Sequence, residues 1–277
     1  MISTPLKKGP FRPIMSRSDC LQVGPGYDWF WDDFSSGKWE PDTLAILDHH
    51  VDTNTLYLDI GSWIGPTLLH AAGRARLAVG FEPDPVAFAS LEANVAANPQ
   101  LKNIRIHCCA ISDKAGHVTM GSQGKPGDSM SSVLFNELDN GWEVSARRLE
   151  DMAVEWPVDG PCFVKIDIEG GEFSVLPSMI PFLRKRRATV FLSLHQYFFL
   201  QSSFGRGVVS QLLGELRLFA RILRFYPLLR AYPFIHDDKR RRLRPRDFLF
   251  RRRHWRTANT LLLSHTPPPW AGAGPIA

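Results

Sequence analysis

The chain has 277 residues, of which 44% are hydrophobic and 22% charged, enough apolar content for a large core and too much for a disordered protein. No apolar stretch reaches the roughly 20 residues that span a bilayer. No signal-peptide-like apolar run follows Lys7 and Lys8. The four cysteines have no metal-ligand spacing, which is typical of free thiols in a reducing compartment. We therefore expect a cytoplasmic globular protein with no transmembrane segment.

The net charge of +5 conceals two parts of opposite sign. Residues 201–277 hold 15 lysines and arginines against 4 acidic residues, whereas residues 1–200 hold 18 against 24. Ten of the 18 residues at positions 239–256 are basic. Such a stretch could bind nucleic-acid phosphates, anionic lipid or an acidic partner. The apolar residues interleaved with its arginines favour instead a solvated face of a strand and its loops.

An alternation of short apolar runs and helical patterns begins at residue 56. The first three predicted strands are residues 56–60, 78–81 and 104–111. Pro83 and Pro85 end the second strand and start a helix over residues 86–97. Strands separated by helices in this way are typical of βαβ units in a parallel sheet.

The alternation pauses over residues 112–160, where many glycines predict an insertion of loops and hairpins. It resumes with predicted strands at 162–168 and 189–194 and predicted helices at 172–187 and 208–224. Residues 247–252 and 260–264 are predicted as a closing pair of strands, followed by a flexible tail. We expect three parts: a lead-in segment with a helix (1–54), an α/β core (55–200) and a basic portion that completes the sheet (201–277).

A glycine turn follows the first strand in the sequence LDIGSWIG, residues 58–65. Gly61 and Gly65 allow the backbone to approach a ligand at the carboxyl edge of the sheet. Glu82 ends the next strand, where an acidic side chain can accept hydrogen bonds from both hydroxyls of a ribose. The glycine spacing is not the dinucleotide fingerprint, and Asp59 would repel a pyrophosphate. Asp59 suits the ammonium and sulfonium of S-adenosylmethionine; the alternative is a tight turn beside a solvated acid.

Three side chains that can move protons lie at the carboxyl ends of the fourth and fifth predicted strands: Asp167, Glu169 and His195. Strand alternation puts Asp167 and Glu169 on one side, one near the cofactor and one near an acceptor. His195 is a candidate general base, since the unperturbed pKa of histidine is about 6.5. We predict no metal, although the three residues could instead hold a divalent ion. Lys165 is expected on the opposite side, as a packed or solvated lysine.

Across residues 39–200 the chain resembles the FkbM family of S-adenosylmethionine-dependent methyltransferases. The motifs that carry the resemblance are Trp39-Glu40 on a lead-in helix, the 58–65 turn, Phe81-Glu82-Pro83-Asp84, Ala110-Ile111-Ser112-Asp113, Arg148-Leu149-Glu150-Asp151, Val164-Lys165-Ile166-Asp167-Ile168-Glu169-Gly170, and His195 at the end of the fifth strand. The resemblance implies an α/β fold of the class I methyltransferase (Rossmann-like) type, with a doubly wound, mostly parallel sheet of seven strands and an antiparallel closing strand. It also places Asp113 at the adenine end of the cofactor. The cofactor-binding residues that we expect are Asp59, Gly61, Ser62, Gly65, Glu82, Asp113 and Asp167.

Two positions depart from the family pattern. Ser62-Trp63 stands where the family usually has Ala-Asn, and Ser193 stands where it usually has an acid two residues before the histidine. These changes concern the acceptor and the shape of the pocket more than cofactor binding.

The resemblance implies methyl transfer from S-adenosylmethionine to a hydroxyl on a sugar or another secondary metabolite, so the expected partner is a small-molecule or glycan acceptor. One alternative is a nucleic-acid methyltransferase or binder that uses residues 239–256. Another is a non-catalytic interaction module with a methyltransferase-like fold. The intact Asp59, Gly61, Gly65 and Glu82 argue against that second alternative.

Overall fold

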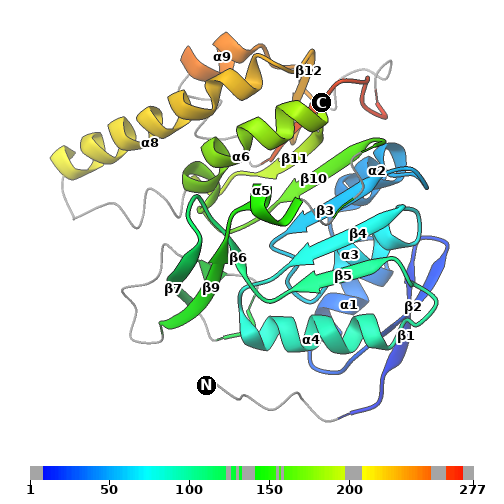
Figure 1. Cartoon of the computed structure of the whole chain (residues 1–277). Coiled ribbons are helices and arrows are strands. Elements are labelled where there is room, and N and C mark those ends of the chain that lie inside the picture. The colour runs from blue at the N-terminus through cyan, green and yellow to red at the C-terminus, as the bar shows by residue number, and fades with distance from the viewer. Residues whose placement is uncertain are drawn as a thin grey trace.

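The protein is described here by a computed structural model that covers residues 9–122, 126–128, 131–132, 141–153, 156, 159–196, 208–250 and 260–270. A central seven-stranded sheet has the strand order β12-β13-β11-β10-β3-β4-β5 (Figure 1). Its strands are β3 (Leu56–Ile60), β4 (Leu77–Phe81), β5 (Ile104–His107), β10 (Cys162–Ile166), β11 (Thr189–Ser193), β12 (Phe234–Asp237) and β13 (Thr260–Ser264). β13 runs antiparallel to both of its neighbours, β11 and β12, and the other strand pairs of this sheet are parallel. The expected class I methyltransferase fold is confirmed.

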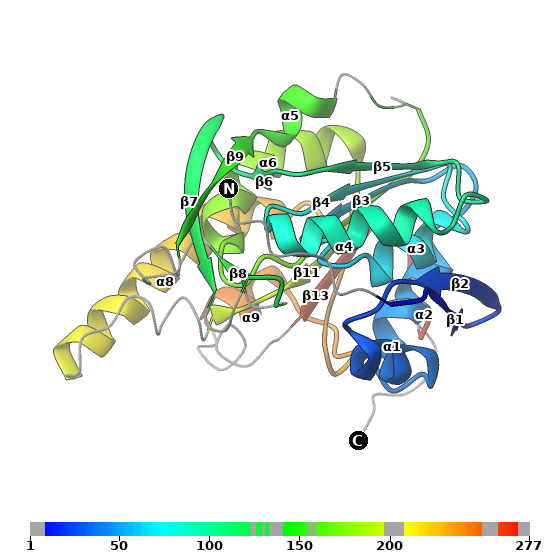
Figure 2. The same cartoon turned by 90° about the horizontal axis from the view of Figure 1, so that it is seen from below.

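Two helical layers cover the sheet, because alternate residues of each strand point to opposite faces. On one face Leu56, Leu58 and Ile60 belong to a core shared with α5 (Leu149–Met152), α6 (Glu172–Arg186) and α8 (Val208–Leu229). On the other face Tyr57 packs with α2 (Pro41–His50), α3 (Pro66–Ala72) and α4 (Pro85–Ala96). The two layers lie on opposite sides of the sheet in Figure 2. The central strands are therefore buried on both faces, as a parallel sheet requires.

The N-terminal segment forms a hairpin and a helix that pack beside α3. The hairpin strands are β1 (Arg12–Ser16) and β2 (Asp19–Val23), and α1 (Asp28–Ser35) buries an aromatic face against Leu69. Trp39 and Glu40 were expected on a helix, and this prediction is wrong. They link α1 to α2, with Glu40 at φ 36°, because Pro41 disfavours helical backbone in the residue before it.

A second, four-stranded sheet lies beyond the carboxyl edge of β5. It contains β6 (Ala110–Ile111), β7 (Gly116–Ser122), β8 (Ser131–Ser132) and β9 (Trp142–Arg147), in the order β6-β9-β7-β8. The single strand predicted over residues 104–111 is therefore divided between two sheets. The Cys109 N–H turns back to the His107 carbonyl at 3.0 Å, and β6 then pairs with β9. The hairpin expected within residues 112–160 is present as the antiparallel pair of β7 and β9.

The C-terminal part supplies both last strands of the central sheet, but one of them is not the predicted segment. Residues 245–250 form α9 (Pro245–Phe250), and residues 251–252 lie outside the described residues. Pro245 occupies the first turn, where it is well tolerated, and Phe248 is buried against Phe225 of α8. The partner of β13 is β12 instead.

None of the described helices combines the length and the apolar character that crossing a membrane requires. Most of the predicted flexible tail, residues 271–277, lies outside the described residues.

The turn after β3 gives a stability prediction. Gly61 has φ +86°, and a Cβ there would lie 1.8 Å from the Asp167 carbonyl oxygen. Gly37 has φ +73° with nothing within 4 Å of such a Cβ, so it is a matched control for backbone strain alone. We expect Gly37→Ala to cost about 1–2 kcal/mol of unfolding free energy. Gly61→Ala should cost at least about 2 kcal/mol more, because backbone must move.

Urea unfolding of both variants, followed by circular dichroism, measures the difference. Equal losses in the two variants would show that Gly61 is required only for its backbone conformation and not for close packing of the turn after β3 against the turn after β10.

Candidate active site

A cavity of about 640 Å³ opens at the carboxyl ends of β3, β4, β10 and β11. This volume lies in the range of small-molecule sites in proteins. Two predicted residues, Asp59 and Gly65, do not line the cavity. The predicted residues that do line it are Gly61, Ser62, Glu82, Asp113, Asp167, Glu169 and His195.

The glycine turn forms part of the cavity wall through its backbone. The N–H groups of Gly61 and Ser62 both donate to the Phe81 carbonyl at 3.0 Å. The Ser62 hydroxyl donates to the Asp59 carbonyl at 2.9 Å and accepts the Phe81 N–H at 3.1 Å. Gly65 begins α3 at φ +96°, where a Cβ would lie 2.6 Å from the Leu91 Cδ1. Ser62 and Gly65 therefore shape the turn, and Gly61 is the glycine that faces the cavity.

Glu82 is the acid at the end of β4, and its side chain is 6% exposed. Its Oε2 accepts the Trp63 N–H and its Oε1 accepts the Asp84 N–H, both at 2.8 Å. Burial raises the pKa of Glu82 to about 8, although these two N–H groups act in the opposite direction. Each carboxylate oxygen keeps a second lone pair. Glu82 can therefore accept hydroxyl hydrogen bonds from a ligand in the cavity.

Lys165 is buried in the cavity wall between two carboxylates. Its Nζ lies 3.0 Å from Asp167 Oδ2 and 3.6 Å from Asp59 Oδ1, and Asp59 Oδ2 also accepts the Thr67 hydroxyl at 2.7 Å. Burial acts to lower the pKa of Lys165, but Asp167, Asp59 and Glu40 outweigh it and raise the pKa. The expectation of a lysine on the opposite side is wrong. Lys165 and Asp167 are two residues apart, so both point to the same side.

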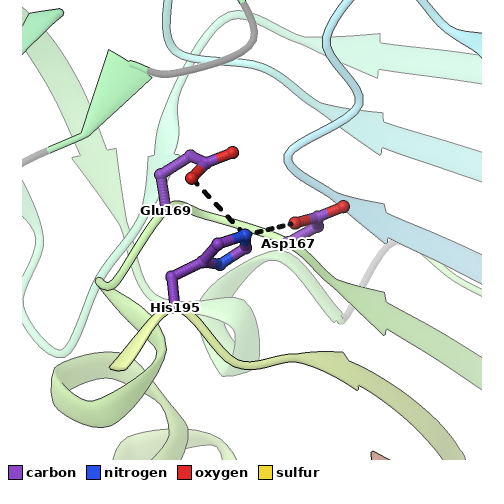
Figure 3. A group of neighbouring side chains, drawn as sticks. All are labelled: Asp167, Glu169 and His195. Carbon is purple, nitrogen blue, oxygen red and sulfur yellow. Dashed lines mark ion pairs between the residues drawn. The ribbon is translucent and has the colours of Figure 1, made fainter. Parts of the chain in front are cut away.

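Asp167, Glu169 and His195 point toward one another, as Figure 3 shows, and all three line the cavity. His195 Nε2 lies 3.6 Å from Asp167 Oδ1 and 3.4 Å from Glu169 Oε2. Strand alternation does not bring Glu169 to this cluster, because β10 ends at Ile166. Glu169 reaches the cluster through a turn in which its own φ is 52°. Ligand atoms of the three residues lie within 4.8 Å of one another, close enough to share a divalent cation.

Glu172 contacts His195 on the Nδ1 side of its ring. Its Oε1 lies 2.8 Å from His195 Nδ1 and also accepts the Ile168 N–H at 3.1 Å. Burial acts to lower the pKa of His195, but Glu172, Asp167 and Glu169 together raise the pKa to about 9. The neighbouring carboxylates therefore favour the protonated imidazole. The general-base role expected for His195 stays a prediction.

The two carboxylates beside His195 differ in proton affinity. Burial raises the pKa of Glu169 to about 7, with His195 opposing. Burial also acts to raise the pKa of Asp167, but Lys165 and His195 outweigh it and lower the pKa. Glu169 is thus the group in this cluster that exchanges a proton near neutrality. Asp167 stays a carboxylate.

Three charged side chains of the site are absent from the predicted set: Lys165, Glu172 and Glu40. Lys165 carried a usable signal, its two-residue spacing from Asp167. Glu172 begins α6 and is buried, with no sequence pattern that connects it to His195, 23 residues away. Glu40 lines the cavity. From the sequence it could lie over the cofactor through its helix or pair with a surface base.

Trp63 fixes the wall beside Glu82. Its indole N–H donates to the Gly127 carbonyl at 3.0 Å, and the Tyr27 hydroxyl donates to the same oxygen at 2.9 Å. The Gly127 N–H donates to Asp84 Oδ2 at 2.7 Å. The residue that departs from the family pattern thus anchors a segment of the insertion over the cavity. Asp113 lies on the same wall as an exposed side chain that follows β6.

Comparison with protein-family models gives a match to the Methyltransferase FkbM domain over residues 52–227, which is more than half of the chain. The chain belongs to the FkbM methyltransferase family. Comparison with curated proteins gives no match.

Solved structures with a similar arrangement are distant in sequence. Methyltransferase FkbM from Methylobacillus flagellatus is 19% identical, with a TM-score of 0.39, over 51% of this chain and 33% of its own; this chain thus matches about a third of that protein's length. Precorrin-6y C5,15-methyltransferase from Geobacter metallireducens is 11% identical, with a TM-score of 0.33, over 65% and 68% of the two chains. A tRNA (uracil-54, C5)-methyltransferase from Pyrococcus abyssi, in complex with S-adenosyl-L-homocysteine, is 11% identical, with a TM-score of 0.35, over 68% and 35%.

Two of the six described basic residues in the stretch at 239–256 form ion pairs in the fold of this FkbM chain. Arg240 pairs with Asp42 at 2.5 Å, and Arg241 pairs with Asp237 at 2.6 Å. Residues 251–256 lie outside the described residues. Arg240 and Arg241 thus have a structural role, whereas the other described basic residues are exposed: Lys239, Arg242, Arg244 and Arg246.

The protonation of His195 can be tested directly. NMR titration of the ring should give a midpoint near pH 9, and Glu172→Gln should lower it by about one unit or more, because Gln keeps the acceptor oxygen but loses the charge. Glu143→Gln, an exposed change on β9, is the matched control. Because the pKa of His195 is higher in the folded than in the unfolded state, its protonation stabilises the fold. This stabilisation is fully present below about pH 6.5 and is lost as pH rises to about 9. The loss is at most about 1.4 kcal/mol per pH unit. A wild-type midpoint near 6.5 would contradict this assignment.

Proposed function

We propose that this FkbM-family chain uses S-adenosylmethionine to methylate a hydroxyl of a sugar or another secondary metabolite. Family membership supports methyl transfer. The observation that carries the proposal is the placement of acids in the cavity: Glu82 follows β4 and Asp167 follows β10, the two strands that flank β3 and its Gly61 turn. We place the reaction in the cytoplasm, because the four free cysteines suit a reducing compartment.

The acidic side chains of the cavity support a cationic donor. Acidic residues line it at Glu40, Glu82, Asp167 and Glu169, whereas its basic residues are Lys165 and His195. Burial raises the pKa of Glu40, Glu82 and Glu169, and a bound ligand with an ammonium and a sulfonium would favour their ionised forms. The same acids disfavour the pyrophosphate of a nicotinamide dinucleotide. Glu82 would accept the ribose hydroxyls, Gly61 would allow close approach of the backbone, and Asp113 would lie toward the adenine.

When bound, S-adenosylmethionine supplies an electrophilic methyl group on its sulfonium. The chain must orient the acceptor hydroxyl in line with that methyl group and remove the proton of the hydroxyl. Glu169 accepts this proton in the proposed mechanism, since its pKa of about 7 matches the task. His195, held by Glu172, forms ion pairs that keep Asp167 and Glu169 in place. The ion-paired cluster performs these roles without a metal.

Cofactor binding is tested by thermal unfolding with S-adenosylmethionine, S-adenosylhomocysteine or NAD. Ligand at 100 times Kd stabilises by about 2.7 kcal/mol, and each kcal/mol raises Tm by roughly 2–4 °C at this size. We expect a rise of several degrees with the two adenosyl ligands only, which Glu82→Ala abolishes. Glu92→Ala, an exposed change on α4, should keep the full shift. An equal shift with NAD would contradict the assignment of the donor.

Catalysis is tested by transfer of a labelled methyl group to a panel of hydroxylated sugars and metabolites. Glu169→Gln should lower kcat by about 10²–10⁴-fold, the usual contribution of a general base, while the thermal shift with S-adenosylmethionine is unchanged. Glu143→Gln serves again as the control. The wild-type rate should rise with pH through about 7, as Glu169 loses its proton. Full activity in Glu169→Gln would refute its role as the base, and transfer only to nitrogen acceptors would refute the acceptor class.

A further inference from the structure

α8 carries an apolar face on the side that points away from the core. Its buried side belongs to the main core through Leu218, Ile222 and Phe225, all 0% exposed. On the other side Leu212, Leu213, Leu216 and Leu223 are 59%, 50%, 56% and 43% exposed. Leu212, Leu216 and Leu223 are four and seven residues apart, so they lie along one stripe of the helix. The core therefore accounts for only one of the two apolar sides of α8.

A row of arginines borders this leucine stripe. Arg217, Arg221 and Arg224 follow at spacings of four and three residues, on the face next to the leucines. Arg217 and Arg224 are exposed and form no ion pair with any described residue. Glu215 is the only acidic residue of α8. The solvent side of the helix is thus apolar along its middle and positively charged along one edge.

The helix is also placed where a flat surface can reach it. Both views show the N-terminal part of α8 extending away from the sheet and its helical layers (Figures 1 and 2). The leucines at positions 212, 213 and 216 belong to this part. A broad planar partner can therefore contact the stripe without meeting the central sheet.

We propose that this face of α8 binds the surface of an anionic lipid membrane. Amphipathic helices that lie in the plane of a membrane bury an apolar face below the headgroups and place basic side chains at the anionic lipid phosphates. The leucines of α8 supply the first contact, and Arg217 and Arg224 supply the second. A nucleic acid needs the arginines but gives four exposed leucines no apolar partner, so it fits the surface less well.

The arginine edge contacts the wall of the cavity. Arg221 donates to the hydroxyl of Ser174, which lines that cavity. A membrane bound along α8 would therefore lie close to the site. The surface itself does not depend on the proposed activity, and its test needs no turnover.

The experiment is co-sedimentation of the full chain with phosphatidylcholine vesicles, with and without phosphatidylglycerol. We expect binding only to the anionic vesicles, decreasing as salt is added, because exposed charges are screened. Leu212→Ser combined with Leu216→Ser should weaken binding by at least about tenfold, from the lost apolar contact. Met15→Ser, which removes an exposed apolar side chain far from α8 in the chain, should leave it within about twofold.

A second pair of variants separates the charges of α8 from net charge. Arg217→Glu combined with Arg224→Glu should also abolish binding. Lys102→Glu combined with Lys114→Glu makes the same change of net charge at exposed sites outside α8 and should bind nearly as wild type. Circular dichroism and Tm values equal to wild type establish that each variant is folded.

Three outcomes would overturn the proposal. The first is equal binding to neutral and anionic vesicles. The second is binding to single-stranded RNA that the leucine changes leave intact, with no binding to vesicles, which would make α8 a phosphate-binding surface. The third is a wild-type dimer in sedimentation velocity that the leucine changes convert to a monomer, again without vesicle binding, which would make the stripe a contact between copies of this chain.

Discussion

The site depends on one buried ammonium between two carboxylates. Lys165 and Asp59 are directly paired across β10 and β3, and the Lys165 side chain reaches on to Asp167. Two carboxylates at adjacent strand ends would repel each other in this buried region. Removal of one partner from a buried ion pair leaves a costly uncompensated charge. Burial raises the pKa of Asp59 and Lys165 opposes that rise, whereas at Asp167 Lys165 and His195 outweigh burial and lower the pKa. The carboxyl ends of β3 and β10 can then close around one cavity.

Neighbouring charges give similar side chains of the site different pKa values. Lys165 and His195 outweigh burial at Asp167 and lower its pKa, so Asp167 keeps its charge. Burial raises the pKa of Glu169 to about 7, so Glu169 exchanges a proton near neutrality. His195 is bound on Nδ1 by Glu172 and faced on Nε2 by two carboxylates, so it becomes a cation. Acid and base roles follow from these neighbours, because residue type alone gives only the unperturbed pKa.

α8 has two apolar sides, one packed against the core and one exposed to solvent. Its inward side is fully buried against α6 and α9, through Phe225 packed between Phe173 and Phe248. Its outward side repeats leucine at helical spacing where a surface helix normally carries charge. The helix also contacts the wall of the cavity, because Arg221 donates to the hydroxyl of Ser174.

The sequence by itself determined the parallel βαβ pattern, the glycine turn after β3 and the acids at the ends of β4 and β10. These are local features, since apolar runs, glycine and proline act on the backbone within a few residues. Tertiary structure decided which segment pairs with β13, because Phe248 is equally apolar in a strand or a helix and only its packing against Phe225 selects the helix. It also decided that Glu172 would hold His195, 23 residues along the chain, and that Lys165 would lie between Asp59 and Asp167. The charge state of each group depends on these distant partners, and so the chemistry of the site was set by the fold.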